Sequence, residues 1–279
     1  MIRAHFSDSY LLDPRHPVTV NVIGAGGTGS QVVTSLARMD QALRRLGHPG
    51  LFVRVYDPDT VSESNIGRQL FSEADLGLNK AQCLITRINR FFGNEWAAVP
   101  ERYREPEDNR FANLFITCTD SKSSRLQLSK LLKAHRPGNG YTDYSTPLYW
   151  CDFGNAQKTG QVIMGTIRRN IKQPESKKFE TVSRLPFVTE YVKGYARIQE
   201  EESGPSCSLA EALGRQDLFV NSALAHLGCS LLWKMFREGI VFCHGFYMNL
   251  DTMRVNPIMI RTISKKCGKR VNISEDCSC

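Results

Sequence analysis

Apolar and polar residues alternate in blocks along the first half of the chain, and the period of the pattern changes from block to block. Three β-branched, strand-like runs are each followed by a segment in which apolar residues recur every three or four positions. In chain order these blocks are 18–23, 30–46, 51–57, 79–92, 113–120 and 122–134. This alternation predicts an α/β fold with a parallel sheet, whose ligand lies beyond the carboxyl ends of the strands.

The second half of the chain predicts an antiparallel extension of that sheet. Strand-like segments at 148–154 and 161–167 flank a turn-rich stretch and predict a hairpin at the sheet edge. Helical spacing returns over 209–237, and residues 239–260 predict two strands about a turn at Asp251. We therefore expect a Rossmann-like α/β sheet, mostly parallel with an antiparallel extension.

Two polar segments interrupt or end this pattern. Residues 168–206 are rich in charged side chains and predict a long mobile loop, and residues 264–279 predict a loose, cysteine-containing tail. The chain has 279 residues, of which 41% are hydrophobic, enough for one sizeable core. We expect a single domain over 1–263.

Composition narrows the class of protein. The sequence has no run of 18 apolar residues and no apolar N-terminal segment, so we expect neither a membrane span nor a secretory signal. Nine cysteines scattered through apolar runs are typical of a reducing compartment, and we expect a cytoplasmic protein. The net charge of +8 lies in short clusters without interleaved aromatic residues, which argues against nucleic-acid binding.

The turn after the first strand has the spacing of a phosphate-binding glycine loop. Gly24, Gly26 and Gly29 let the backbone turn tightly, approach a phosphate and pack the next helix against the strand, and Gly27 lies among them. Asp57 ends the next strand, where an acid binds ribose hydroxyls. This pattern alone leaves open a glycine turn without a ligand, and it does not distinguish a nicotinamide cofactor from ATP.

The next stretch carries a more specific signal. Residues 57–81 read DPDTVSESNIGRQLFSEADLGLNKA, which combines an acid–x–acid turn, a Ser–Asn pair, an Arg–Gln pair and a glycine shortly before a lysine. At this spacing after a glycine loop, the segment resembles the ThiF/MoeB/HesA family of adenylating enzymes, relatives of the ubiquitin-activating enzymes. Residues 204–221 resemble, more narrowly, the ThiF-related proteins of bacterial PRTRC cassettes.

The resemblance implies that the chain uses ATP and Mg²⁺ to adenylate the C-terminal carboxylate of a ubiquitin-like or sulfur-carrier protein. Charge then develops between the α-phosphorus and pyrophosphate, where Arg68 supplies a planar fork and Lys80 a point charge. Asp120 is an oxygen ligand for Mg²⁺. The implied nucleotide-binding residues are Gly24, Gly26, Gly27, Gly29, Asp57, Asp59, Asn65, Arg68 and Lys80. The alternative for Arg68 and Lys80 is solvated surface charge, and for Asp120 a helix N-cap.

One cysteine is a candidate acyl acceptor. Cys207 follows the charged segment and precedes a helix pattern, where relatives place a reactive cysteine and where a helix N-terminus lowers a thiol pKa. The alternative is a Ser-Cys-Ser turn in which a serine caps the helix. We expect no structural zinc, because the two CxxC pairs of many relatives are absent. Cys267, Cys277 and Cys279 would need a fourth ligand such as His244.

The family also implies a homodimer and a β-grasp partner that ends in glycine, and the PRTRC likeness implies that the same cassette encodes this partner. Two other functions stay open. A nicotinamide- or flavin-dependent oxidoreductase leaves Asn65, Arg68, Gln69 and Lys80 unexplained. A non-catalytic binding module would use the net charge of +8 to dock an acidic partner or DNA.

Overall fold

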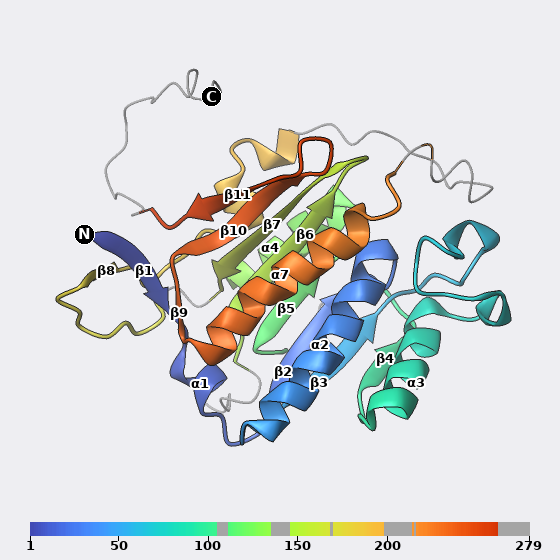
Figure 1. Cartoon of the computed structure of the whole chain (residues 1–279), viewed down its shortest axis with the longest axis horizontal. Helices are drawn as coiled ribbons and strands as arrows, with labels where there is room; N and C mark the ends of the chain where they lie inside the picture. Colours follow the sequence, from blue (N-terminus) through green and yellow to red (C-terminus); the bar gives the residue numbers. More distant parts are fainter. Residues whose placement is uncertain (105–110, 135–145, 168–169, 198–213, 215, 262–279) are drawn as a thin grey trace.

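The computed structural model describes residues 1–104, 111–134, 146–167, 170–197, 214 and 216–261. Within these residues the larger sheet has eight strands in the order β11-β10-β7-β6-β5-β2-β3-β4 (Figure 1). Their bounds are β2 Val18–Ile23, β3 Leu51–Tyr56, β4 Ala97–Val99, β5 Leu114–Thr117, β6 Tyr149–Asn155, β7 Thr159–Thr166, β10 Cys243–Asn249 and β11 Arg254–Met259.

The sheet is parallel from β4 to β6 and antiparallel beyond it. Strands β4, β3, β2, β5 and β6 pair in parallel, and β7, β10 and β11 then pair antiparallel in turn. This confirms the predicted mixed sheet. The prediction that the β6–β7 hairpin forms the sheet edge is wrong, because β10 pairs with β7 and β11 lies beyond β10.

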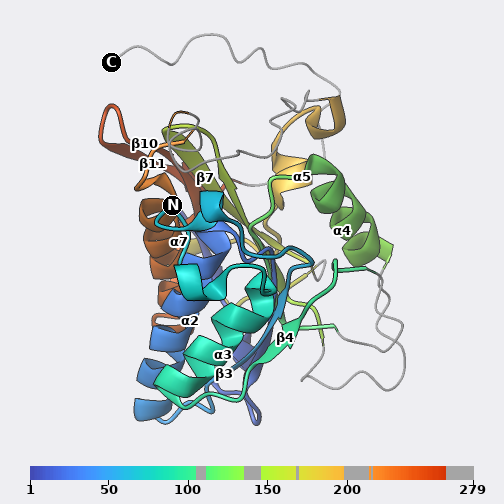
Figure 2. The same cartoon turned by 90° about the vertical axis from the view of Figure 1, so that its right-hand side faces the viewer.

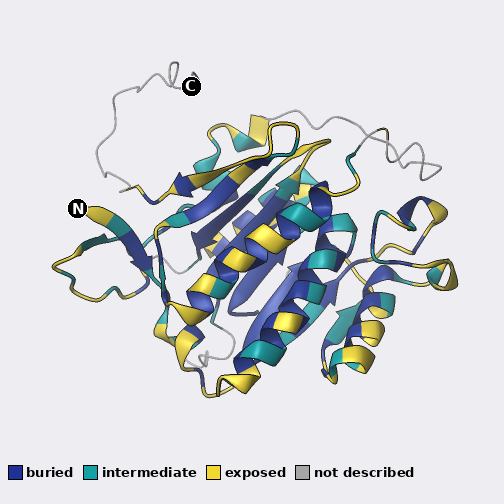
Figure 3. Cartoon of the chain, viewed as in Figure 1, coloured by how far each residue is buried: buried dark blue, intermediate teal, exposed yellow. Residues whose placement is uncertain are grey.

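Helices cover both faces of this sheet. Helices α2 (Gly27–Arg45) and α7 (Val220–Arg237) pack side by side on one face, together with α3 (Lys80–Phe92). Helices α4 (Lys122–Ala134) and α5 (Val188–Tyr191) lie on the other (Figure 2). Central strands are therefore buried on both sides, as all six residues of β2 are (Figure 3). None of the helices in the described ranges is long and apolar enough to cross a membrane.

The helix boundaries follow local signals in the sequence. Asn79 caps α3 by accepting a hydrogen bond from the Gln82 amide at 3.0 Å, and Gly93 ends it with φ +71°. The predicted helix over 209–237 is present from Val220 onward, and Gly239 follows it with φ +65°. Residues 209–213 lie outside the described part of the chain.

A small second sheet joins the N-terminal strand to two short segments from the second half of the chain, and the sequences of these strands show no clear period. It contains β1 (Ile2–Phe6), β8 (Phe179–Thr181) and β9 (Ile240–Val241), and α1 (Ser9–Leu12) follows β1. Strand β1 pairs in parallel with β8 and antiparallel with β9. Strand pairs of two or three residues are too short to show alternation in a sequence.

The prediction of one long loop over 168–206 does not hold for residues 170–197. That range contains β8, α5 and a 3₁₀ turn at Tyr195–Arg197. Isolated apolar residues between the charged ones are buried in the core, namely Ile171, Val182, Leu185, Phe187 and Val188. These buried apolar side chains pack an irregular segment against the sheet, and their spacing follows neither a helical nor a strand period.

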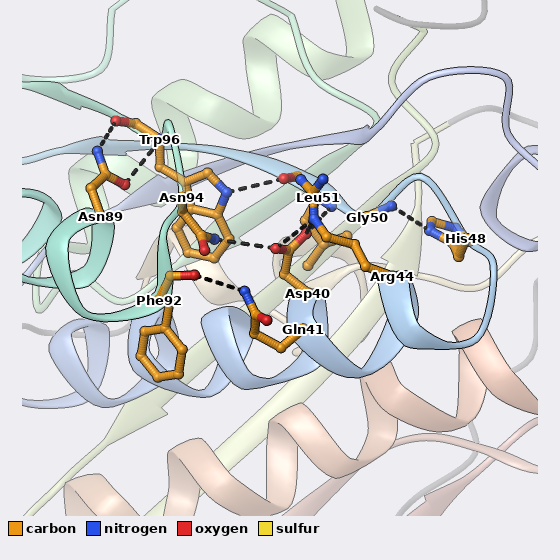
Figure 4. A network of polar contacts seen from close by, with 10 residues as sticks. All are labelled: Asp40, Gln41, Arg44, His48, Gly50, Leu51, Asn89, Phe92, Asn94 and Trp96. Atoms are coloured by element: carbon orange, nitrogen blue, oxygen red, sulfur yellow. Dashed lines mark hydrogen bonds and ion pairs between the residues drawn. The ribbon is translucent and has the colours of Figure 1, made fainter.

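Two buried polar clusters link the layers. Asp40 in α2 is 1% exposed and accepts hydrogen bonds from the Leu51 amide, Arg44 and Asn94, which ties the end of α2 to β3 and to the turn after α3 (Figure 4). On the other face, Arg125 of α4 forms a buried ion pair with Asp152 of β6, with Nε and Oδ1 2.6 Å apart. In both clusters the buried carboxylate accepts several hydrogen bonds, one of them from an arginine.

Candidate functional site

The glycine loop lies at the carboxyl edge of the parallel strands, between β2 and α2. Gly24 has φ +100°, and a Cβ placed there would stand 2.7 Å from the Cys118 carbonyl oxygen. A Cβ on Gly29 would stand 1.9 Å from the Gly24 carbonyl oxygen. Only glycine fits either position, and the loop therefore packs directly against the end of β5. Helix α2 begins at Gly27. The first-turn amides of α2 thus face the carboxyl edge of the sheet, and a helix N-terminus favours an anion.

Asp57 closes this loop from the neighbouring strand. It directly follows β3, is 5% exposed, and accepts hydrogen bonds from the Ala25 amide at 2.6 Å and the Asp59 amide at 2.9 Å. Burial raises the pKa of Asp57, and the two amide hydrogen bonds work against that shift. Besides the ribose-binding role predicted from the sequence, the carboxylate therefore fixes the glycine loop to the end of β3.

Lys80 lies beside Asp59 at the start of α3. Its Nζ is 3.5 Å from Asp59 Oδ2, and its side chain is 10% exposed, whereas the Asp59 side chain is 64% exposed. The Lys80 amide donates to the Asp59 carbonyl oxygen, and the Asn79 side-chain amide donates to the carbonyl oxygens of Asp57 and Asp59. The alternative of a solvated surface lysine does not fit, because the side chain is largely buried.

Arg68 and Gln69 approach the loop from the segment between β3 and α3. The Arg68 guanidinium is half-buried, burial lowers its pKa, and its Nη1 donates to Gln216 Oε1 at 2.7 Å. Its Nε and the Gln69 Oε1 are buried atoms without a hydrogen-bond partner among the described residues. That Oε1 lies 4.0 Å from where a Cβ on Gly26 would stand. Unpartnered polar atoms beside a helix N-terminus are groups that a ligand can satisfy.

The Asn65 side chain forms a hydrogen bond within its own turn. It ends the 3₁₀ turn Glu63–Asn65, is 6% exposed, and its Oδ1 accepts the Ser62 amide at 3.0 Å in a capping box. Its side-chain oxygen thus shapes the turn that leads to Arg68. The Nδ2 group remains the atom through which a phosphate contact is proposed.

Asp120 is exposed and follows β5 by three residues. The N-cap alternative is not supported, because Ser121 Oγ accepts the Ser124 amide at 3.2 Å at the start of α4. The preceding backbone packs on the loop, since the Cys118 amide donates to the Ile23 carbonyl oxygen at 2.8 Å. The Asp120 carboxylate is therefore free to face solvent near the glycine loop.

The candidate cysteines separate into described and undescribed ones. Cys207 lies outside the described residues, as do Cys267, Cys277 and Cys279. Burial raises the pKa of the thiols of Cys118, Cys151 and Cys243, which disfavours reactive thiolates there. His244 is buried, and its Nδ1 pairs with the Met164 carbonyl oxygen. In the described ranges no group of three or more His, Cys, Asp or Glu side chains is placed to hold a metal.

Sequence reasoning missed the groups that α7 brings to the loop. Asn221 in the first turn of α7 is 2% exposed, and its Oδ1 accepts from Thr28 Oγ1 at 2.8 Å and from Asn155 Nδ2 at 2.5 Å. A Cβ on Gly27 would stand 2.6 Å from Asn221 Nδ2. The missing side chain at Gly27 thus makes room for Asn221. A polar residue inside an apolar helix pattern was the one sequence signal for it.

These features define the class of the protein as a Rossmann-like α/β protein with a glycine loop, two cations and an acid at the carboxyl edge of its parallel strands. A family model described as the ThiF family matches residues 15–267. The chain belongs to the ThiF family. No curated protein matches it in sequence.

Solved structures share this fold. The chain is similar to PaaA, with a TM-score of 0.52 and 16% identity over 87% of this chain and 64% of that one. It is similar to E. coli MccB solved with ATP, with a TM-score of 0.54 and 14% identity over 90% of this chain and 67% of MccB. The structure of E. coli MccB with selenomethionine MccA gives a TM-score of 0.55 at 14% identity over 89% of this chain and 66% of MccB. This chain thus spans about two thirds of their length.

Proposed function

We propose that this protein uses Mg·ATP to adenylate the C-terminal carboxylate of a ubiquitin-like or sulfur-carrier protein and releases pyrophosphate. The observation that carries the proposal is Arg68, a half-buried guanidinium with an unpartnered Nε, whose neighbour Gln69 lies against Gly26 of the glycine loop. Membership of the ThiF family supports it. So do the structures of E. coli MccB with ATP and with MccA, since they pair this fold with a nucleotide and with a second molecule, MccA.

In the proposed reaction, a carboxylate oxygen of the carrier attacks the α-phosphorus of ATP. A bond forms between these two atoms, the bond from the α-phosphorus to the bridging oxygen breaks, and pyrophosphate leaves with that electron pair. The first-turn amides of α2 bind phosphate oxygens, and Asp57 holds the ribose. Arg68 and Lys80 stabilise the charge that grows on the leaving group, which a hydride transfer would not need.

Asp120 fits the Mg²⁺ that the family implies. Its carboxylate is exposed near the glycine loop and is not used as a helix cap. Mg²⁺ in nucleotide sites takes one or two carboxylates and completes its shell with water and phosphate oxygens. We propose Asp120 as the protein ligand. When bound, the ion would supply neutralising charge at the phosphates.

The partners are proposed on the resemblance of the sequence. They are a β-grasp carrier that ends in glycine, encoded in the same PRTRC cassette, and a second copy of this chain in a homodimer. The carrier presents only a carboxylate at its end, which suits an edge with two cations and amide donors.

Ligand-dependent melting tests the nucleotide class. We expect Mg·ATP at a hundred times its Kd to stabilise the protein by about 2.7 kcal/mol, because a ligand that binds only the native state shifts the unfolding equilibrium. NADH at the same concentration should leave the melting temperature unchanged. A shift with NADH and none with Mg·ATP would favour the oxidoreductase alternative and contradict the proposal.

Cys207 is the proposed acyl acceptor, and its serine variant tests that step. A thiolate would attack the carbonyl carbon of the acyl adenylate, form a thioester and expel AMP. We expect Cys207→Ser to keep pyrophosphate exchange and to lose a thiol-sensitive, carrier-sized adduct that the wild type shows by mass spectrometry. Cys151→Ser is the matched control. If the adduct persists in Cys207→Ser, the acceptor is another residue.

A further inference from the structure

A series of hydrogen bonds between neutral side chains links Arg68 to the first turn of α2. Arg68 Nη1 donates to Gln216 Oε1 at 2.7 Å, and the same oxygen accepts from Asn221 Nδ2 at 3.0 Å. Asn221 Oδ1 in turn accepts from Thr28 Oγ1 at 2.8 Å. Every member is an amide or a hydroxyl except Arg68. The guanidinium is thereby joined, through α7, to the helix that carries the glycine loop.

The end of this hydrogen-bond series at Asn221 and Thr28 is rigid. Asn221 is 2% exposed and Thr28 is 6% exposed. Asn155 Nδ2 donates to Asn221 Oδ1 at 2.5 Å and to Thr28 Oγ1 at 3.2 Å, so β6, α2 and α7 meet at one point. A buried amide whose oxygen and nitrogen both have hydrogen-bond partners has one orientation. Gln216 therefore holds Arg68 against a fixed support.

At the other end of the series, the hydrogen bond from Arg68 to Gln216 leaves the Arg68 charge uncompensated. Among the described residues, no ion pair includes Arg68, and its Nε has no partner. By contrast, the buried Arg125 is paired with the carboxylate of Asp152. A neutral acceptor orients a guanidinium without cancelling its charge, which is the arrangement an anionic ligand needs.

We propose that Gln216 is a positioning residue, supported by Asn221, that aims the Arg68 guanidinium at the nucleotide phosphates while leaving its charge uncompensated. This inference rests on the proposed function. It adds two residues that lie outside the motif segment 57–81. It also explains why the side chain of residue 216 is neutral, since a carboxylate in its place would pair with Arg68.

Two substitutions of Gln216 separate positioning from a merely structural role. Gln216→Leu removes the acceptor, and Gln216→Glu keeps an acceptor oxygen for Arg68 and Asn221 but adds a negative charge. By calorimetric titration with Mg·ATP we expect about tenfold weaker binding for Gln216→Leu, and about 100-fold weaker binding for Gln216→Glu, because the new ion pair competes with phosphate. A structural role predicts the opposite order, since Glu preserves the hydrogen bonds.

The matched control is Gln173→Glu, a half-buried glutamine whose side chain bonds the backbone of Phe6 in β1. It should bind Mg·ATP as the wild type does. The melting temperature of Gln216→Glu should stay at or above that of Gln216→Leu. If Gln216→Glu binds Mg·ATP as well as Gln216→Leu or better, the positioning role is wrong and the proposed function stands. If the wild type does not bind Mg·ATP, both are wrong.

Discussion

Arg68→Ala and Lys80→Ala are each expected to lower the rate of ATP–pyrophosphate exchange by about 10²-fold or more. Removal of one preorganised donor to a developing charge costs about 3 kcal/mol of transition-state stabilisation. Melting temperatures should stay near wild type, because Arg68 has no carboxylate partner among the described residues and Lys80 contacts one largely exposed carboxylate at 3.5 Å. Exchange kinetics and thermal melting of the same preparations check both statements.

The matched control is Arg38→Ala, an exposed arginine on the outer side of α2, the helix that begins at the glycine loop. Its exchange rate should equal that of the wild type. If Arg68→Ala and Lys80→Ala also exchange normally, both side chains are structural or surface charges and the phosphate site must lie elsewhere.

The half of the fold that supports the site could be predicted from local sequence signals. Strands β2, β3 and β5 are short apolar runs. Helices α2, α3 and α4 show helical spacing, and Gly or Asn lies at the ends of α2 and α3. Their order dictates a parallel sheet. The prediction that β7 lies at the sheet edge was wrong. The pairing of β10 with β7 joins segments about 80 residues apart, as the His244–Met164 contact shows. Local periods carry no information on such pairings.

The candidate site could be predicted in part, for the same reason. Gly24, Gly29 and Asp57 lie in one short stretch of motifs, and their geometry follows from it. Gln216 and Asn221 lie 148 residues from Arg68 and 193 residues from Thr28 respectively, with no shared period. Only the packing of α7 against α2 brings them to the loop.

Arg125→Met is expected to destabilise the protein by about 3–5 kcal/mol, because it leaves the carboxylate of Asp152 buried without its cation. Asp152 is 1% exposed, and besides Arg125 its Oδ1 accepts only from Thr117 Oγ1, at 2.5 Å, within the described residues. Burial lowers the pKa of Arg125, but the attraction of Asp152, the hydrogen bond to it and the nearby Tyr195 together raise that pKa, so the guanidinium stays charged in the native state. Urea unfolding measures the loss.

The control for that loss is an exposed pair in the same protein. Arg3 and Glu180 are 2.9 Å apart, with side chains 39% and 41% exposed, and Arg3→Met should cost less than about 1 kcal/mol. The double variant Arg125→Met/Asp152→Leu should recover much of the stability, since it removes both buried charges. A loss in Arg125→Met no larger than that in Arg3→Met would contradict the account of the buried pair.

The central claim is that ATP activates a carboxylate at the edge formed by the glycine loop, Arg68 and Lys80. Its most direct test is exchange of radiolabelled pyrophosphate into ATP by the wild-type chain with Mg²⁺ and the proposed β-grasp carrier that ends in glycine. The account predicts rapid exchange with this carrier and none when its terminal carboxylate is amidated. Exchange that is absent with the free carboxylate, or that persists with the amide, would contradict carboxylate adenylation at this site.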